Sequence, residues 1–399
     1  MLLLIQQIVR RITDELKNVP LYVAPFLVGL DSRIEQLLGV LSVKSSGVKF
    51  LGLHGVGGVG KTTLAKALYN KLVVHFEKRC LVADIREAFM QSGGLISLQD
   101  KILSVLSPHL PPLDDFGSRK NAIKQALSTV RVLLLLDDID DASQLDMLIG
   151  RREWFHEGSR IIITTRNKEA LSARNYVIEH YEVPELFFDD ALRLFSYRAF
   201  SKEKPTDEFL ELSKQIVSLA GNLPLALEVF GSFLVDKRRK SEWEGTLQKL
   251  KEIRPDNLQD KLKISYDGLD DATKPIFLDA ACLFVKTHMT REEAIEIWKG
   301  CGFQAEIGLR VLVSRSLIKI MKDDHTLWMH DQLRDMGRQI VRHQNAHDPG
   351  TRSRLWDRNE IMAVFKNGTV WKFCIITAFA FSVVNTIVHT SHVVVLDCY

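Results

Sequence analysis

Between about Val48 and Thr165 the chain alternates apolar runs with stretches of helical periodicity. The runs "VKFLGLHG", "CLVADIRE", "RVLLLLDD" and "SRIIITTR" predict strands, and "TTLAKALYNKLVVHF" has the apolar spacing of a helix. Near-continuous apolar strands are typical of a parallel sheet that is covered on both faces. We therefore expect an α/β domain with a parallel sheet over residues 26–185.

The strand pattern stops after Pro184, and helices are predicted from there on. "ALRLFSYRAF", "FLELSKQIVSLAG" and "PLALEVFGSFLV" repeat apolar residues at helical spacing, with Gly221 ending one helix and Pro224 near the start of the next. Further on, the alternating halves of "LIKIMKDDHTLWMH" flank a polar turn, which is a hairpin signal. We expect a helical bundle over 186–270 and a winged-helix domain over 271–365.

The two ends of the chain have patterns of their own. Residues 1–25 begin with "MLLLIQQIVRRITDELKN", whose apolar spacing predicts an amphipathic helix or linker; as a secretory signal its apolar run is too short and its charges come too late. Residues 366–399 contain "FCIITAFAFSVVNTIVH", which is uncharged and near the minimum length of a membrane span. A β-prone segment normally covered by another part is the alternative, and we favour it.

Composition excludes some classes of protein. The net charge of +3 over 399 residues is small, and the densest basic patch is the short "DKRRK", so a concentrated nucleic-acid-binding face is not indicated. The 5 cysteines are widely spaced, without a C-x-x-C pair that would indicate zinc. Reduced thiols are typical of a cytoplasmic or nuclear protein.

The stretch "LHGVGGVGKTTLA" fits two phosphate-binding patterns. Gly55, Gly57 and Gly60 match G-x-G-x-x-G, which cradles a dinucleotide, and the same residues match G-x-x-x-x-G-K-[ST], which holds a triphosphate. Lys61 and Thr62 decide for the triphosphate, because a dinucleotide site does not need them. The Lys61 ammonium would reach the β- and γ-phosphates, and the Thr62 hydroxyl would ligate Mg²⁺.

Two later strands end in residues that suit the same site. "RVLLLLDD" ends in Asp137 and Asp138, the Walker B arrangement, and we expect Asp137 to hold the metal and Asp138 to orient or activate the attacking water. "SRIIITTR" ends in Arg166, which would lie beside the strand of Asp137 and contact the γ-phosphate. An arginine at a strand end is more often a surface residue, so this assignment depends on the other two motifs.

These motifs resemble those of a known family. "GVGGVGKTT", "LLLLDDID", "GSRIIITTR", "GNLPLAL", "FLDAACLF" and "MHD" follow the order of the NB-ARC module of plant disease-resistance proteins. "CLVADIRE", "DDID" and "PGTRSRLWDRNEI" resemble the subclass with a Toll/interleukin-receptor-like domain. The resemblance covers roughly Leu4 to Thr369, and the chain looks like a fragment without that domain and without leucine-rich repeats.

The resemblance implies an intracellular immune switch that binds ADP when closed and ATP with Mg²⁺ when open. It implies other immune-receptor or signalling chains as partners, homo-oligomerisation on activation and no specific nucleic acid. Backbone groups of two residues would contact the adenine, a proline would pack on the nucleotide, and a histidine would approach the ADP β-phosphate. The adenine contacts would be Val28 and Gly29, the proline Pro224 and the histidine His330. The phosphates would be held by Gly57, Gly58, Val59, Gly60, Lys61, Thr62 and Thr63.

Simpler interpretations remain open for several of these residues. Val28 and Gly29 could form an ordinary turn, Pro224 could start a helix, and His330 could be the first residue of a helix after the hairpin. Other functions are an ATPase that remodels partners, a winged-helix DNA-binding regulator, and a truncated adaptor or decoy. Against DNA binding, "TREEAIEIWKGCGFQAEIGLRVLVSRS" carries as many acids as bases.

Overall fold

The computed structural model describes residues 20–91, 93–172, 175–253, 257–287, 289–321 and 324–366. The amphipathic helix expected near the N-terminus and the apolar tail after Lys366 lie outside the described residues. The chain divides into two compact units, Met1–Asp190 and Ala191–Tyr399, which are taken one at a time below. In the described part, no helix combines the length and the apolar character that a membrane crossing requires.

The first unit is built on a five-stranded sheet with the order β2-β3-β4-β1-β5, in which all paired neighbours run parallel. Its strands are β1 (Lys49–His54), β2 (Lys78–Val82), β3 (Val132–Ile139), β4 (Arg160–Thr165) and β5 (Ile178–Glu182). The expected α/β domain with a parallel sheet is therefore confirmed. All six residues of β4 and nearly all of β3 are buried, because helices cover both faces of the sheet.

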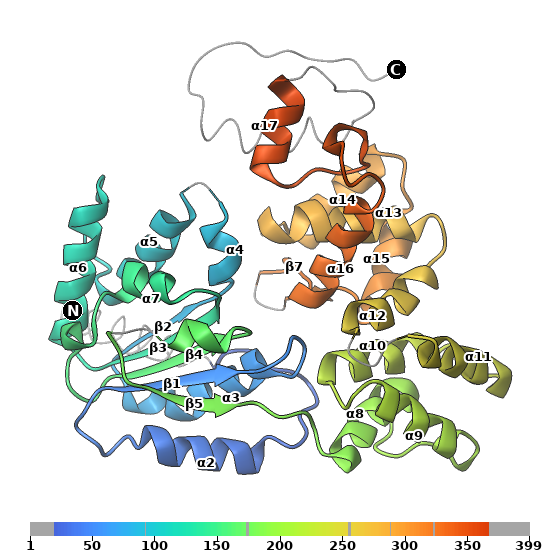
Figure 1. Cartoon of the computed structure of the whole chain (residues 1–399), viewed down its shortest axis with the longest axis horizontal. Helices are drawn as coiled ribbons and strands as arrows, with labels where there is room; N and C mark the ends of the chain where they lie inside the picture. Colours follow the sequence, from blue (N-terminus) through green and yellow to red (C-terminus); the bar gives the residue numbers. More distant parts are fainter. Residues whose placement is uncertain are drawn as a thin grey trace, which may run out of the picture. The chain divides into compact units, whose positions relative to one another are not determined.

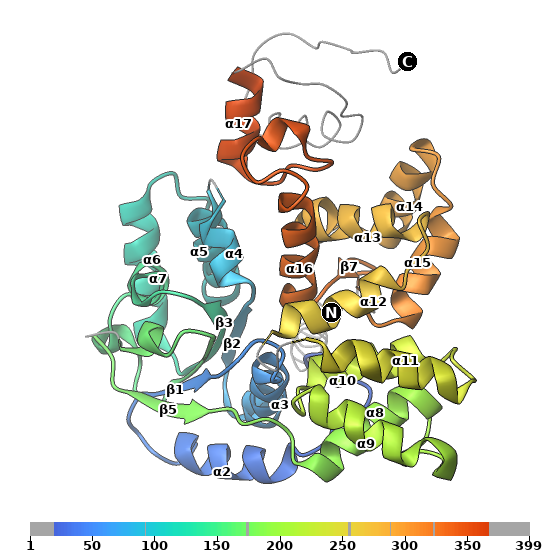
Figure 2. The same ribbon diagram turned by 45° about the vertical axis from the view of Figure 1, so that its right-hand side comes forward.

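The helices form a layer on each face of this sheet (Figures 1 and 2). One face carries α2 (Asp31–Leu41) and α3 (Lys61–Leu72), and the other carries α4 (Ile85–Phe89), α5 (Gly94–Leu106), α6 (Phe116–Thr129) and α7 (Ala142–Ile149). Short 3-10 turns occur at η1 (Val73–His75), η2 (Arg152–Trp154) and η3 (Lys168–Leu171).

Two details of the sheet differ from the sequence prediction. "CLVADIRE" is not one strand: β2 ends at Val82, Asp84 adopts a left-handed backbone (φ 55°), and α4 begins at Ile85. The chain turns there and presents Arg86 from a helix. The edge strand β5 was not predicted, because Glu179 and His180 are exposed and the strand lacks a continuous apolar run.

In its described residues the second unit is helical, with a small hairpin formed by β6 (Lys319–Ile320) and β7 (Leu327–Trp328), as predicted. Its helices are α8 (Phe188–Phe200), α9 (Leu210–Leu219), α10 (Pro224–Leu234), α11 (Lys240–Lys251), α12 (Leu258–Asp267), α13 (Thr273–Asp279), α14 (Arg291–Gly300), α15 (Ala305–Ser314), α16 (Asp331–Arg342) and α17 (Arg358–Lys366). Short turns lie at η4 (Asp207–Phe209), η6 (Val285–Thr287) and η7 (Pro349–Thr351), and a π-helical turn, η5 (Ala280–Phe284), follows α13.

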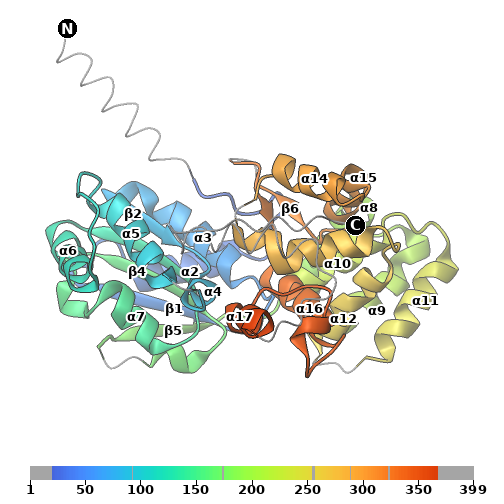
Figure 3. The same cartoon turned by 90° about the horizontal axis from the view of Figure 1, so that it is seen from above.

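Aromatic packing holds the first helices of this unit together. The buried Trp243 of α11 contacts the rings of Phe195, Phe200 and Phe209, with centroids 4.7–6.0 Å apart. Gly221 stops α9 in a left-handed conformation (φ 65°), as expected. Farther along, α14 and α15 lie side by side before the hairpin, and α16 follows it (Figure 3). This is the helix–hairpin arrangement of a winged helix.

Candidate functional site

The loop between β1 and α3 has a backbone that requires glycine. Gly55 (φ 148°), Gly58 (φ 81°) and Gly60 (φ 100°) all have positive φ, which residues with a side chain rarely adopt. At Gly55 a Cβ atom would also lie 3.1 Å from the carbonyl oxygen of Val183. Gly60 is the N-cap of α3. The loop therefore leads directly into a helix N-terminus, where backbone N–H groups favour anions.

Lys61, the first residue of α3, folds back over this loop. Its side chain is buried, and Nζ donates to the carbonyl oxygens of Gly55 and Val56, 2.9 Å away in each case. Burial and the nearby charge of Arg166 lower the pKa of Lys61 to about 8. The ammonium thus stays mostly protonated at pH 7 and supplies a positive charge at the loop.

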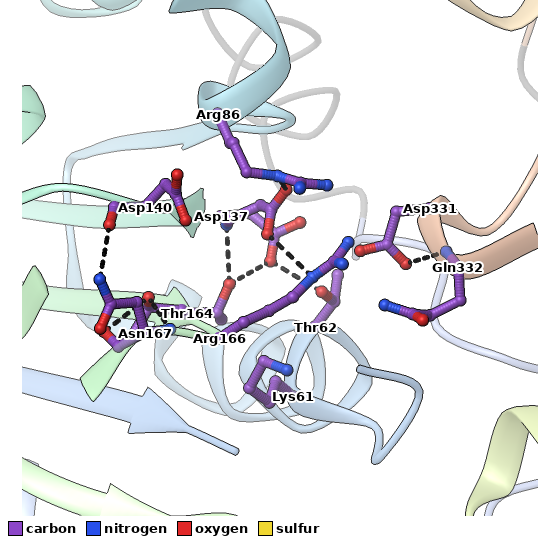
Figure 4. Close-up of polar contacts among 12 residues, drawn as sticks. Lys61, Thr62, Arg86, Asp137, Asp140, Thr164, Arg166, Asn167, Asp331 and Gln332 are labelled. Atoms are coloured by element: carbon purple, nitrogen blue, oxygen red, sulfur yellow. Dashed lines mark hydrogen bonds and ion pairs between the residues drawn. The ribbon is translucent and has the colours of Figure 1, made fainter. Parts of the chain in front are cut away.

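Three oxygen-bearing side chains converge where β3 and β4 end (Figure 4). The hydroxyls of Thr62 and Thr164 donate to Asp137 Oδ1 at 2.8 and 2.6 Å. Burial raises the pKa of Asp137, and the two hydroxyl donors oppose that shift. A carboxylate next to a hydroxyl is a donor set that suits Mg²⁺, which usually takes its remaining ligands from water and phosphates. Within the described ranges, no group of three or more His, Cys, Asp and Glu residues could hold a metal.

Asp138 has an unusual backbone and two basic neighbours. It lies at a register shift between β3 and β4, has φ of 61°, and donates its N–H to Thr164 Oγ1 at 2.9 Å. Its carboxylate contacts Arg86 Nε at 3.0 Å and Arg166 Nε at 3.6 Å. Asp138 therefore lies between two guanidinium groups, and its assignment to water activation stays a prediction.

The structure brings Lys61, Thr62, Asp137, Asp138 and Arg166 together at the carboxyl ends of the strands. Since β4 pairs with β3, the residue after β4 does lie beside the strand of the two aspartates. The phosphate, metal and catalytic roles of these residues, and those of the other loop residues, remain predictions.

Sequence reasoning missed two residues of this cluster. Thr164 lies in the predicted strand "SRIIITTR", where the sequence indicates no role for it, and Arg86 lies inside the predicted strand "CLVADIRE". The signal for Arg86 is not local, because its importance follows from β2 lying next to β3 in the sheet.

Val28 and Gly29 precede α2, in a segment packed against the first turn of α8 and the residues just before it. Val28 is buried, and Gly29 has φ of 65° with a Cβ position only 2.8 Å from Asp190 Oδ2. Arg33 of α2 donates to the carbonyl oxygens of Pro184 and Glu185 and ties the two segments together. This close approach explains the need for glycine, while contact with adenine stays a prediction.

Pro224 and His330 belong to the second unit, where each starts a helix. Pro224 is the first residue of α10. His330 is the N-cap of α16, its Nδ1 accepts from the backbone N–H of Gln332 at 3.2 Å, and it contacts the carboxylate of Asp331. These are the simpler interpretations given above, and a nucleotide-binding role for either residue remains a prediction.

A parallel sheet, a G-x-x-x-x-G-K-T loop between a strand and a helix, and an aspartate at a buried strand end define the class of P-loop nucleotide-binding proteins. Comparison with known families narrows the class. Residues 30–205 match the NB-ARC domain, and residues 270–345 match the winged-helix domain of the Roq1-like disease resistance proteins. The chain thus belongs to the NB-ARC family of plant disease-resistance proteins.

Individual relatives agree with this assignment. TMV resistance protein N of Nicotiana glutinosa is 37% identical over 372 residues, and disease resistance protein RPV1 of Vitis rotundifolia is 40% identical over 355 residues. These alignments cover 92% and 88% of this chain but 32% and 25% of the relatives. The chain therefore spans between a quarter and a third of their length.

Among solved structures, a signal transduction ATPase with numerous domains and a tetratricopeptide repeat sensor from Pyrococcus horikoshii is similar to this chain. It has a TM-score of 0.49 and 14% identity, and the match covers 92% of this chain and 49% of that one.

Proposed function

We propose that this chain is the nucleotide-dependent switch of a plant immune receptor, exchanging ADP in a closed state for ATP in an open state. The observation that carries the proposal is the cluster at the strand ends, where Lys61 covers the loop and Thr62 contacts Asp137. This arrangement supports binding of a phosphate chain together with Mg²⁺ on Thr62 and Asp137. When bound, the metal would neutralise phosphate charge.

Each remaining residue has a role in this proposal. Lys61 pairs with the β- and γ-phosphates, and Arg166 binds the γ-phosphate through its planar guanidinium. Val28 and Gly29 contact the adenine. The phosphates are held by backbone groups of Gly55, Gly57, Gly58, Val59, Gly60 and Thr63, and ADP is retained by Pro224 and His330.

A switch of this kind works by population shift. ATP favours the open state only by as much as it binds that state more tightly than the closed one. The proposal includes action in the cytoplasm or nucleus, with other immune-receptor chains or signalling proteins as partners and self-association on activation.

The test is to purify the chain, denature it and identify any nucleotide that is released. We expect stoichiometric ADP from the wild type, none from Lys61→Ala, and faster ADP loss from His330→Ala than from Lys251→Ala, a control at an exposed position. A wild-type chain that neither carries nor binds nucleotide would refute the proposal.

Two other outcomes would replace it. Steady turnover at about 1 s⁻¹ or faster without a partner would identify an ordinary ATPase with a remodelling role. Tight nucleotide binding with no change of shape or self-association on exchange would identify an adaptor or decoy.

A further inference from the structure

Three charged side chains meet at the ends of β3 and β4, and the proposed function uses only part of this cluster. Asp138 Oδ2 lies 3.0 Å from Arg86 Nε, and Asp138 Oδ1 lies 3.6 Å from Arg166 Nε. All three are largely buried, with side chains 15%, 18% and 21% exposed. Figure 4 shows Arg86 descending from α4 and Arg166 extending from the end of β4, so that both guanidinium groups approach the region beside Asp137 and Thr62.

The fold explains why one carboxylate meets two arginines. The sheet order places β3 between β2 and β4, and α4 follows β2, so Arg86 and Arg166 approach Asp138 from opposite neighbours. Asp138 has a left-handed backbone (φ 61°), which residues other than glycine adopt rarely and aspartate more often than most. The bond from its N–H to Thr164 holds this conformation.

We propose that Asp138 and the γ-phosphate of ATP compete for the same two guanidinium groups, with Arg86 as a second γ-phosphate-binding residue. This inference rests on the proposed nucleotide switch and deepens it. ADP lacks the group that would draw the arginines away, so with ADP they stay on Asp138. Asp138 is then a positioning residue that sets the preference for ADP over ATP.

The physical basis is the relative strength of the two kinds of ion pair. Both a carboxylate and a phosphate can offer two oxygens to the guanidinium fork, but the terminal phosphate carries more negative charge. Lys61 interacts electrostatically with Arg166, Asp138 and Asp137, and Thr62 contacts Asp137. Both observations support placing the end of the phosphate chain at these strand ends. The Arg86 contact with Asp138 is the shorter of the two, so Arg86 contributes the larger part of the competition.

The test compares the affinity of the whole chain for ADP and for the slowly hydrolysed analogue ATPγS, by calorimetry in Mg²⁺. The measured quantity is the ratio of the ATPγS affinity to the ADP affinity. Arg86→Gln is expected to lower this ratio about tenfold. Asp138→Asn is expected to raise it about threefold to tenfold, because both arginines are released. The exposed neighbour Asp140 provides the control, and Asp140→Asn should leave the ratio unchanged.

Competition predicts that Arg86→Gln and Asp138→Asn change the affinity ratio in opposite directions. If the ion pair were only structural, removing either partner would have the same effect. In the double variant of Arg86 and Asp138, only Arg166 is left to be released, so the rise caused by Asp138→Asn should be smaller than in the wild-type background. If Arg86→Gln destabilises the chain, Arg86→Lys can be used in its place, because lysine keeps the charge without the planar guanidinium. The affinity ratio is then expected to fall by less than in Arg86→Gln.

The competition would be overturned if both Arg86→Gln and Asp138→Asn lowered the affinity ratio. A change of less than about twofold in both Arg86→Gln and Arg86→Lys would also overturn it. Wild-type binding that depends on Lys61 would then leave the nucleotide switch standing. A wild-type chain that binds neither nucleotide would overturn both.

Discussion

The individual residues at the strand ends form a chain of contacts from the glycine loop into the sheet. Thr62 is the second residue of α3, and its hydroxyl reaches Asp137, which also accepts from Thr164. The sequence indicated Thr62 and Asp137, because their motifs are short and continuous. It could not indicate Thr164 or Arg86, since their importance depends on which strands lie next to one another.

Thr62→Val tests the metal role at this scale, because valine has nearly the same shape without the hydroxyl. The ATP affinity in Mg²⁺ is expected to fall about tenfold, towards the value measured with a chelator, while the affinity in chelator changes little. Titration with ATPγS in the two buffers measures this. Thr129→Val, at the exposed end of α6, is the control; an undiminished Mg²⁺ effect in Thr62→Val would contradict the assignment.

At the scale of elements, two helices and the hairpin of the second unit are joined by a largely buried acid. Glu228 of α10 contacts Arg198 of α8 at 2.9 Å and Lys319 of β6 at 3.1 Å. Nearby, the hydroxyls of Ser232 and Ser316 lie 2.8 Å apart. The apolar spacing predicted the helix α10, but the sequence carried no sign that Glu228 is largely buried, because both of its partners are distant in the chain.

Glu228→Gln is expected to lower the free energy of unfolding by about 2 kcal/mol at pH 7, since it leaves the largely buried Arg198 and the half-exposed Lys319 without their acid. Burial raises the pKa of Glu228, but the charges of Lys319 and Arg198 outweigh it, so the folded pKa lies below the ordinary 4.5. The pair therefore stabilises the fold above about pH 4.5 and is lost as the pH falls through the folded pKa.

Urea unfolding followed by tryptophan fluorescence, at pH 7 and at acidic pH, measures this prediction. The difference between the wild type and Glu228→Gln should shrink in acid, where the wild-type carboxyl is also neutral. Glu211→Gln removes an exposed partner of Lys214 and should cost less than about 0.5 kcal/mol. Equal effects of the two substitutions would show that the Glu228 cluster contributes no more than a surface pair.

For the whole molecule, the balance of charge bears on the choice of partner. The 53 basic and 50 acidic residues give a net charge of +3, and the winged-helix region carries as many acids as bases in the stretch considered above. A winged helix alone would allow DNA binding. The charge balance argues that this one does not bind DNA, which fits the proposed switch.

We expect fluorescence anisotropy with a labelled duplex to show no salt-dependent binding. A DNA-binding protein loses affinity steeply as salt is added. The logarithm of its binding constant falls against the logarithm of the salt concentration, with a slope of about −0.9 for each phosphate that it neutralises. A steep slope for the wild type, abolished by charge reversal on α15 but not on the exposed face of α6, would contradict this prediction and favour a DNA-binding regulator.

The sequence by itself determined the class of fold and the position of the glycine loop. Apolar runs such as β3 and the Gly-Lys-Thr motif are continuous in the chain, so their periodicity and spacing can be read without knowing the neighbours. The tertiary structure decided the edge strand β5, the turn that presents Arg86 and the environment of Asp138. Arg86 and Asp138 are 52 residues apart, and only the pairing of β2 with β3 brings them together. Such contacts depend on strand order, which local patterns do not encode.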